Sequence, residues 1–165
     1  MEQESWTTDE IEAVVSGFFT TRHSLQTATG IMGELTLLPL RSNDVFRFAS
    51  GRELMLKRKS WWQSWYELEE NGIVSGSTHS HRFFQRETVI QFGGKEFVLK
   101  PAKFWTRYCC LINDTGTPLL EIRPQGIFRR GAWLTILGPV DAALLVFTYY
   151  LVRIRWSEQT AAAAG

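Results

Sequence analysis

The chain has 165 residues, of which 44% are hydrophobic, 13% aromatic and 21% charged. This length predicts one folded domain that buries roughly 70% of the surface of the unfolded chain, and the composition excludes a disordered protein. The formal net charge of +1 excludes the strongly basic composition of a dedicated nucleic-acid-binding protein. Five acidic residues and no basic residue lie within positions 1–12, so the rest of the chain is mildly basic.

The N-terminal region, residues 1–29, is predicted to form a separate segment with a short amphipathic helix over positions 8–19. Thr7, Thr8 and Asp9 are suitable N-cap residues. The apolar residues that follow have helical spacing: Ile11, Val14, Val15 and Phe18. The segment opens with acidic side chains and lacks the basic start and continuous apolar run of a signal peptide. We therefore expect a cytoplasmic protein.

Glycines mark a regular series of turns through the middle of the chain. They recur every 21 or 22 residues, at Gly30, Gly51, Gly72, Gly94 and Gly116. Asn71-Gly72 and Gly93-Gly94 are typical hairpin connectors, because both residue types accept the positive φ of tight primed turns. A repeat of this length holds two strands and two turns, which indicates an antiparallel meander.

Short strand-like segments fill the intervals between these turns. We expect strands at 31–38, 45–49, 53–57, 61–68, 73–77, 82–85, 88–92, 96–99, 104–112, 119–123, 127–129 and 132–137. An open sheet of about 10–12 strands would leave unpaired edges, so closure is favoured. Cys109 and Cys110 are adjacent and would face opposite sides of a strand, so they cannot easily bridge to one another, and a disulfide framework is excluded.

A strongly apolar segment near the C-terminus predicts a buried helix over residues 141–156. Asp141 can cap it, and residues 142–152 are apolar or aromatic on every side of a helix. These eleven residues would span only about 16 Å, less than a bilayer requires. The complete prediction is an all-β fold with terminal helices: a closed antiparallel β-barrel of about 10–12 strands wrapped around the hydrophobic C-terminal helix. Residues 157–165 are predicted to be a disordered tail.

Several short segments within this pattern resemble a known superfamily. They are Tyr66-Glu67-Leu68 before Asn71-Gly72, Val74-Ser75-Gly76 after it, Phe97-Val98-Leu99, the hairpin from Leu111 to Gly116, and Pro139-Val140-Asp141. From about Gly30 to Trp156 the chain resembles the tubby C-terminal domain, the phospholipid scramblases and the LURP-one-related proteins. The resemblance implies a barrel over residues 30–156 around a central helix. Scrambling activity is not implied, because the Pro-rich region, the Cys-rich acylation cluster and the acidic calcium-binding segment of scramblases are missing.

Tubby-like domains bind phosphoinositide headgroups through surface Lys and Arg, so the resemblance implies a lipid-binding module. The candidate lipid-binding residues are Arg52, Lys57, Arg58, Lys59, Trp61 and Trp62. They combine charges that attract phosphate with aromatic rings that favour the membrane interface. The alternative interpretation is that the tryptophans pack in the core and the basic residues solvate a turn. Further basic residues occur at Lys95, Lys100, Lys103, Arg107, Arg129 and Arg130.

The sequence contains no catalytic signature and predicts neither an enzyme nor a need for a cofactor or metal. His79 and His81 would share one face of a strand, but no nearby cysteine or acidic residue supplies a third ligand. Gly93-Gly94-Lys95 lacks the spacing of a phosphate-binding loop.

Three functions are compatible with this pattern. The first is a non-enzymatic module, peripheral to a membrane, that binds anionic phospholipid headgroups such as phosphoinositides, or a protein partner at the membrane surface. The second is a lipocalin-like barrel that carries an apolar small molecule. The third is an accessory protein anchored by a membrane span through residues 132–156. No nucleic-acid partner is expected, and the sequence leaves the oligomeric state open.

Overall fold

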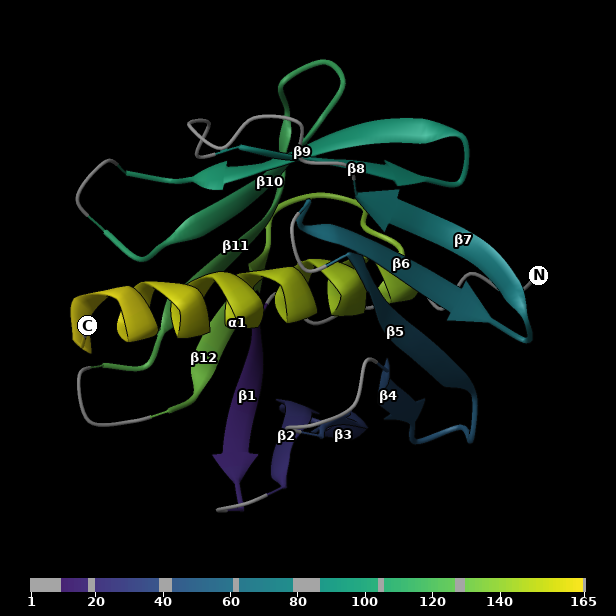
Figure 1. Cartoon of the computed structure of the whole chain (residues 1–165). Helices are drawn as coiled ribbons and strands as arrows, with labels where there is room; N and C mark the ends of the chain where they lie inside the picture. Colours follow the sequence, from purple (N-terminus) through teal and green to yellow (C-terminus); the bar gives the residue numbers. More distant parts are fainter. Residues whose placement is uncertain are drawn as a thin grey trace.

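The computed structural model of the chain describes residues 10–17, 20–38, 43–60, 63–78, 87–103, 106–126 and 130–164. They form twelve strands and one helix in this part of the chain (Figure 1). The elements are β1 (Glu10–Ser16), β2 (Thr21–Thr27), β3 (Gly30–Leu37), β4 (Asn43–Phe48), β5 (Glu53–Ser60), β6 (Trp65–Glu70), β7 (Ile73–Thr78), β8 (Thr88–Phe92), β9 (Lys95–Pro101), β10 (Cys109–Asn113), β11 (Pro118–Pro124), β12 (Ala132–Ile136) and α1 (Ala142–Ala164).

The strands form a closed antiparallel barrel. Each strand pairs with its neighbours in sequence, and β12 returns to pair with β1. In this closing pair Ala13 lies opposite Ala132 and Ile11 lies opposite Leu134. Closure leaves no strand of the barrel with an unpaired edge, which is the arrangement that the sequence favoured.

The predicted amphipathic helix over residues 8–19 is wrong for the part of it that the structure describes. Residues 10–16 form β1, in which Ile11 and Ala13 are buried and the residues beside them are less buried. This alternation is the period of a strand, and pairing with both β12 and β2 stabilises it. Strand β2 was not expected, so the barrel begins at Glu10 rather than at Gly30.

The glycine series marks one end of the barrel. All five glycines of the series have positive φ, and the Asn71-Gly72 turn has φ values of 51° and 78° at its two central residues, as a type I′ hairpin requires. Alternate connections of a meander lie at opposite ends. The β1–β2, β9–β10 and β11–β12 connections therefore share the other end, which we call the loop end.

Helix α1 starts at the end of the barrel that the glycine series marks and leads to the loop end (Figure 1). The Asp141 carboxylate caps it by accepting hydrogen bonds from the amides of Ala143 (2.8 Å) and Leu144 (3.4 Å). The helix continues to Ala164, so the predicted disordered tail is wrong for residues 157–164. These residues favour helix because half of them are alanine, and the hydroxyl of Thr160 donates to the carbonyl of Trp156.

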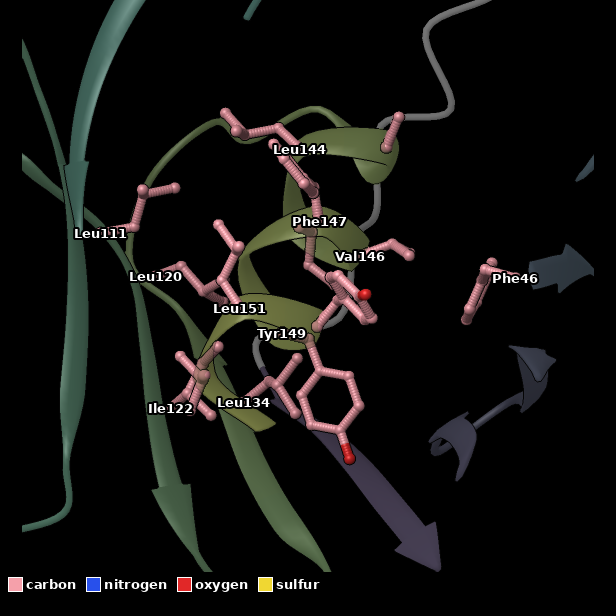
Figure 2. Packing of buried hydrophobic residues seen from close by; sticks show 14 of the residues in the cluster. Phe46, Leu111, Leu120, Ile122, Leu134, Leu144, Val146, Phe147, Tyr149 and Leu151 are labelled. Carbon is pink, nitrogen blue, oxygen red and sulfur yellow. The ribbon is translucent and has the colours of Figure 1, made fainter. Parts of the chain in front are cut away.

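The first half of α1 is buried on every side. All residues from Ala142 to Val152 are buried, and all of them except Thr148 belong to one hydrophobic cluster with buried side chains of the strands. Figure 2 shows Leu120 and Ile122 of β11 on one side of α1 and Phe46 of β4 on the other. At Gly76 of β7 an added Cβ would lie 3.4 Å from the Phe147 ring, so a small residue suits this position.

No helix within the described ranges is both long and apolar enough to cross a membrane. Residues 132–136, which the proposed span through 132–156 would include, form strand β12. Cys109 and Cys110 are free, with Cys109 buried and Cys110 half-buried, as the sequence indicated.

Candidate anion-binding site

The basic residues that sequence analysis selected lie at or before β5, beside the acidic strand β6. Lys57 lies opposite Glu67 in the register of this pair, and its ammonium group contacts the carboxylate of Glu69 at 2.5 Å. The ammonium group of Lys59 lies 3.6 Å from the carboxylate of Glu67. Trp61 and Trp62 lie outside the described residues.

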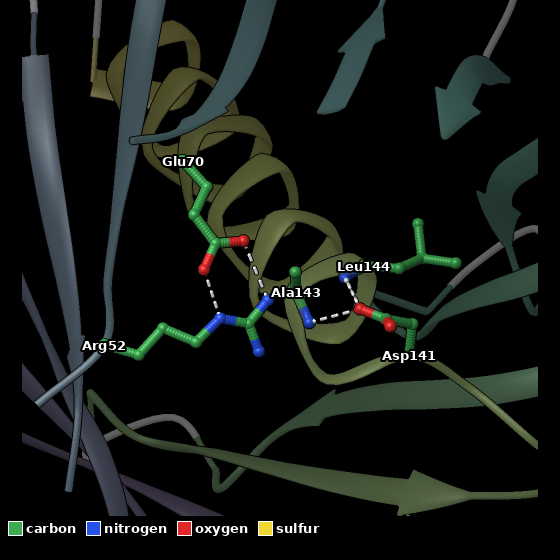
Figure 3. A network of polar contacts seen from close by, with 5 residues as sticks. All are labelled: Arg52, Glu70, Asp141, Ala143 and Leu144. Carbon is green, nitrogen blue, oxygen red and sulfur yellow. Dashed lines mark hydrogen bonds and ion pairs between the residues drawn. The ribbon is translucent and has the colours of Figure 1, made fainter. Parts of the chain in front are cut away.

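Arg52 forms the best-aligned ion pair of this group. Its guanidinium binds both carboxylate oxygens of Glu70, with Nη2 2.9 Å from Oε2 and Nε also donating to Oε1 (Figure 3). These hydrogen bonds, together with the positive charge of Arg52, lower the pKa of Glu70. The Arg52 guanidinium also lies 5.0 Å from the centre of the Phe48 ring.

Arg58 lies between the two lysines in sequence and contacts α1. Its guanidinium is 3.6 Å from the carboxylate of Glu158 and 5.6 Å from the centre of the Tyr66 ring. Each of the four predicted basic residues therefore has an acidic partner. We call the carboxylates of Glu67, Glu69 and Glu70 the acidic ladder, because they offset the positive charge of this surface.

A second basic site forms at the loop end around Trp156 of α1. The guanidinium carbons of Arg107 and Arg153 each lie 5.5 Å from the centre of the Trp156 ring. Trp156 is buried, and its indole N–H donates to the carbonyl of Arg107 at 2.9 Å. Arg153 donates to the carbonyl of Arg130 at 2.8 Å. We call Arg107, Arg130 and Arg153 the arginine cluster.

The arginine cluster differs from the β5 surface in its partners. Within the described ranges, none of its three guanidinium groups forms an ion pair with an Asp or Glu side chain. They bind backbone carbonyls instead: Arg107 that of Trp156, Arg130 that of Gly17 and Arg153 that of Arg130. Burial, together with the positive charges of Arg107 and Arg130, lowers the pKa of Arg153. The cluster is therefore a concentration of positive charge without a direct carboxylate contact in the described part of the chain.

A buried histidine lies next to this cluster. His23 of β2 is fully buried, and its Nδ1 lies 2.7 Å from the hydroxyl of Tyr149, one helical turn before Arg153. Burial lowers the pKa of His23 to about 3, and the charges of Arg153 and Arg130 contribute. The ring is therefore neutral at physiological pH, and the positive charge of the site belongs to the arginines.

The arginine cluster could not be recognised in the sequence, because its members come from three distant segments. Arg107 lies in the β9–β10 connection, Arg130 precedes β12, and Arg153 lies in α1. One signal was available: Arg153 and Trp156 are three residues apart in a helix and so lie on one face. His79 and His81 lie outside the described residues, and the described part of the chain contains no group of three His, Cys, Asp or Glu side chains that could hold a metal ion.

Comparison with known proteins supports the fold. No protein-family model matches the chain, and no curated protein sequence matches it. Among solved structures, the X-ray structure of a protein from Arabidopsis thaliana is similar to this chain, with a TM-score of 0.55 and 11% sequence identity, over 90% of this chain and 91% of that one. A likeness at this identity shows the shared fold alone.

Proposed function

We propose that this chain is a non-enzymatic binding module that attaches to an anionic membrane surface through the arginine cluster. The observation that carries the proposal is the contrast between the two basic sites. The positive charges along β5 face the acidic ladder and Glu158, whereas those around Trp156 face backbone carbonyls. Anionic lipids attract basic residues near the surface by about 1 kcal/mol each. Arginine also presents a planar fork that fits phosphate oxygens, as on phosphoinositide headgroups.

We further infer that α1 occupies the interior of the barrel. Residues 142–152 have no exposed face, and their side chains join those of the strands in one cluster. A helix that is apolar all round must be covered by protein or lipid. A barrel filled in this way leaves little room for an apolar ligand, which favours a binding module over a lipocalin-like carrier. The same plan supports membership of the tubby-like superfamily, with the LURP-one-related proteins and scramblases.

Vesicle sedimentation with the full chain tests the proposed function. The wild-type protein should bind phosphatidylcholine vesicles that contain phosphatidylserine or a phosphoinositide, should bind pure phosphatidylcholine vesicles poorly, and should be released as salt rises. The double variant Arg107→Gln/Arg130→Gln changes two exposed side chains and should weaken binding at least tenfold, since two losses of about 1 kcal/mol exceed the 1.4 kcal/mol of one decade.

The matched control is Arg22→Gln/Arg47→Gln. It removes the same charge from exposed arginines that pair with Glu34 and Glu53 on the barrel wall, and it should bind nearly as well as the wild type. Equal binding to neutral and anionic vesicles would overturn the proposal. Equal losses in the two double variants would do the same, because only net charge would then matter. In either case a protein partner becomes the better hypothesis.

A further inference from the structure

The arginine cluster joins three parts of the chain that are far apart in sequence. Arg107 and Arg153 lie against one tryptophan ring, and Arg153 is hydrogen-bonded to the backbone of Arg130. We propose that the cluster is a defined phosphate site that fastens α1 to the loop end: one phosphate group, free or on a lipid headgroup, is held between Arg107 and Arg153 beside Trp156. This inference rests on the proposed function and adds a stereochemical site to it.

The guanidinium groups of Arg107 and Arg153 have more N–H donors than they use in hydrogen bonds to the described chain. A guanidinium carries five N–H donors. Within the residues that the structure describes, the Arg107 guanidinium donates one hydrogen bond, to the carbonyl of Trp156 at 3.5 Å, and the Arg153 guanidinium donates one, to the carbonyl of Arg130 at 2.8 Å. Both groups therefore retain donors for a ligand. Trp156 fixes their positions, because its buried ring lies against both groups and its N–H is bound to Arg107.

The charge of the cluster fits a phosphate better than a carboxylate. A phosphate monoester carries about −1.5 to −2 charges at neutral pH and has three strong acceptor oxygens. It can accept bidentate hydrogen bonds from one guanidinium and further bonds from a second. A carboxylate has a single charge and two oxygens, and would leave more of the cluster without a counter-ion. Nearby His23 is not part of the recognition, because its ring is buried against Tyr149.

Binding at this place would stabilise the middle of α1, where its buried half ends, within the fold. Arg153 and Trp156 belong to α1, whereas Arg107 belongs to the β9–β10 connection. A ligand that bridges them binds only the folded chain, in which these segments meet. By mass action it raises the free energy of unfolding in a saturable way.

The test uses the full chain without membranes and measures its melting temperature. The probes are inorganic phosphate and a soluble phosphate monoester, titrated against sodium chloride of equal ionic strength. At 100 times the dissociation constant the melting temperature should rise by roughly 5 to 10 °C and then level off. Hydrogen exchange should slow at the amides of the last buried turn of α1, around residues 150–156.

The decisive variant is Arg107→Lys, which keeps the charge and removes the planar fork. Measured against its own baseline, it should lose most of the saturable shift while still binding phosphatidylserine vesicles. Arg47→Gln on the barrel wall should keep the full shift. No saturable shift in the wild type, or an equal shift in Arg107→Lys, overturns the phosphate site and leaves the vesicle result of the proposed function intact. If the wild type shows the saturable phosphate shift but does not bind anionic vesicles, the phosphate site is supported and the proposed function is overturned.

The source of the phosphate is resolved by a second comparison. If it is a headgroup, vesicles with a phosphate-monoester lipid should bind more tightly than phosphatidylserine vesicles of equal surface charge, and the soluble monoester should compete. If it is a free ion, the two vesicles should bind equally while phosphate still raises the melting temperature. Both results support the site.

Discussion

The hydroxyl of Tyr149 in α1 lies 2.7 Å from Nδ1 of His23 in β2, and both side chains are fully buried. This hydrogen bond links the helix to the wall of the barrel inside an apolar cluster. The other ring nitrogen of His23, Nε2, has no hydrogen-bond partner in the described part of the chain. The pair is therefore a polar contact in which one atom already lacks a partner, and it is sensitive to further loss.

Removing the tyrosine hydroxyl should destabilise the fold. Tyr149→Phe keeps the ring and leaves His23 without its hydrogen bond, which should cost about 1–3 kcal/mol of unfolding free energy. The measurement is urea denaturation followed by circular dichroism. The double variant His23→Leu/Tyr149→Phe replaces both partners with apolar groups and should recover part of that loss. If the double variant loses as much unfolding free energy as the Tyr149→Phe and His23→Leu variants together, the contact contributes nothing to stability.

The stability of the protein should decrease as the pH is lowered, because of His23. Its pKa is lowered to about 3 by burial and by Arg153 and Arg130, below the usual value near 6.5. In the unfolded chain the His23 ring therefore binds a proton below about pH 6.5, whereas in the folded chain it does so only below about pH 3. This contribution to stability is complete above pH 6.5 and declines by up to about 1.4 kcal/mol per pH unit as pH falls.

Urea denaturation between pH 7.5 and 4.5 measures this dependence. His23→Leu should show a shallower decline than the wild type, since the other titrating groups are shared. Proton NMR of the ring should show no titration of His23 above pH 4. A midpoint near 6.5 for the resonance that disappears in His23→Leu would contradict the prediction.

The turns and most strands could be predicted from local sequence, because hairpin chemistry is local. Asn71 and Gly72 specify a primed turn whatever surrounds them. Strand β1 could not be predicted in this way, because Ile11, Val14 and Val15 fit a helical face as well as a strand. Its pairing with β12, as in Ala13 opposite Ala132, is a contact between the two ends of the barrel that no local pattern encodes.

The candidate site was harder to predict for the same reason. The basic run Lys57-Arg58-Lys59 is obvious in the sequence. Whether carboxylates offset its charge depends on the register of β5 against β6, which places Glu67 and Glu69 beside it. The arginine cluster depends on the end of the barrel to which α1 leads. Both are tertiary relationships, and the sequence alone left them open.

A charge placed in the buried half of α1 should unfold the protein if the helix fills the barrel. Phe147 is completely buried, so Phe147→Asp would bury an unpaired carboxylate at a cost of several kcal/mol against a total stability of roughly 5–15. The milder Leu145→Ala should remain folded and lose about 2–5 kcal/mol. The matched control Gln159→Asp lies on the exposed part of the same helix and should be close to neutral. A Phe147→Asp protein with native near-ultraviolet circular dichroism and melting temperature would refute the filled barrel.

Removing the acidic ladder should expose the positive charge of the β5 surface. The triple variant Glu67→Gln/Glu69→Gln/Glu70→Gln leaves Arg52, Lys57 and Lys59 without carboxylate contacts that they now make. Three basic groups released in this way should strengthen binding to anionic vesicles at least tenfold. The fold should tolerate the change, because partly exposed ion pairs contribute about 0–1 kcal/mol each.

A second triple variant, Glu34→Gln/Glu53→Gln/Glu96→Gln, controls for net charge with carboxylates outside β6 that do not contact Arg52, Lys57 or Lys59. It makes the same change in charge and releases Arg22 and Arg47 from their partners on the barrel wall. A larger gain in vesicle binding for the ladder variant than for this control would mean that the β5 surface is a lipid-binding surface kept weak by its own carboxylates. Equal gains would mean that β5 has no special role, and the arginine cluster would remain the one site with an argument for lipid contact.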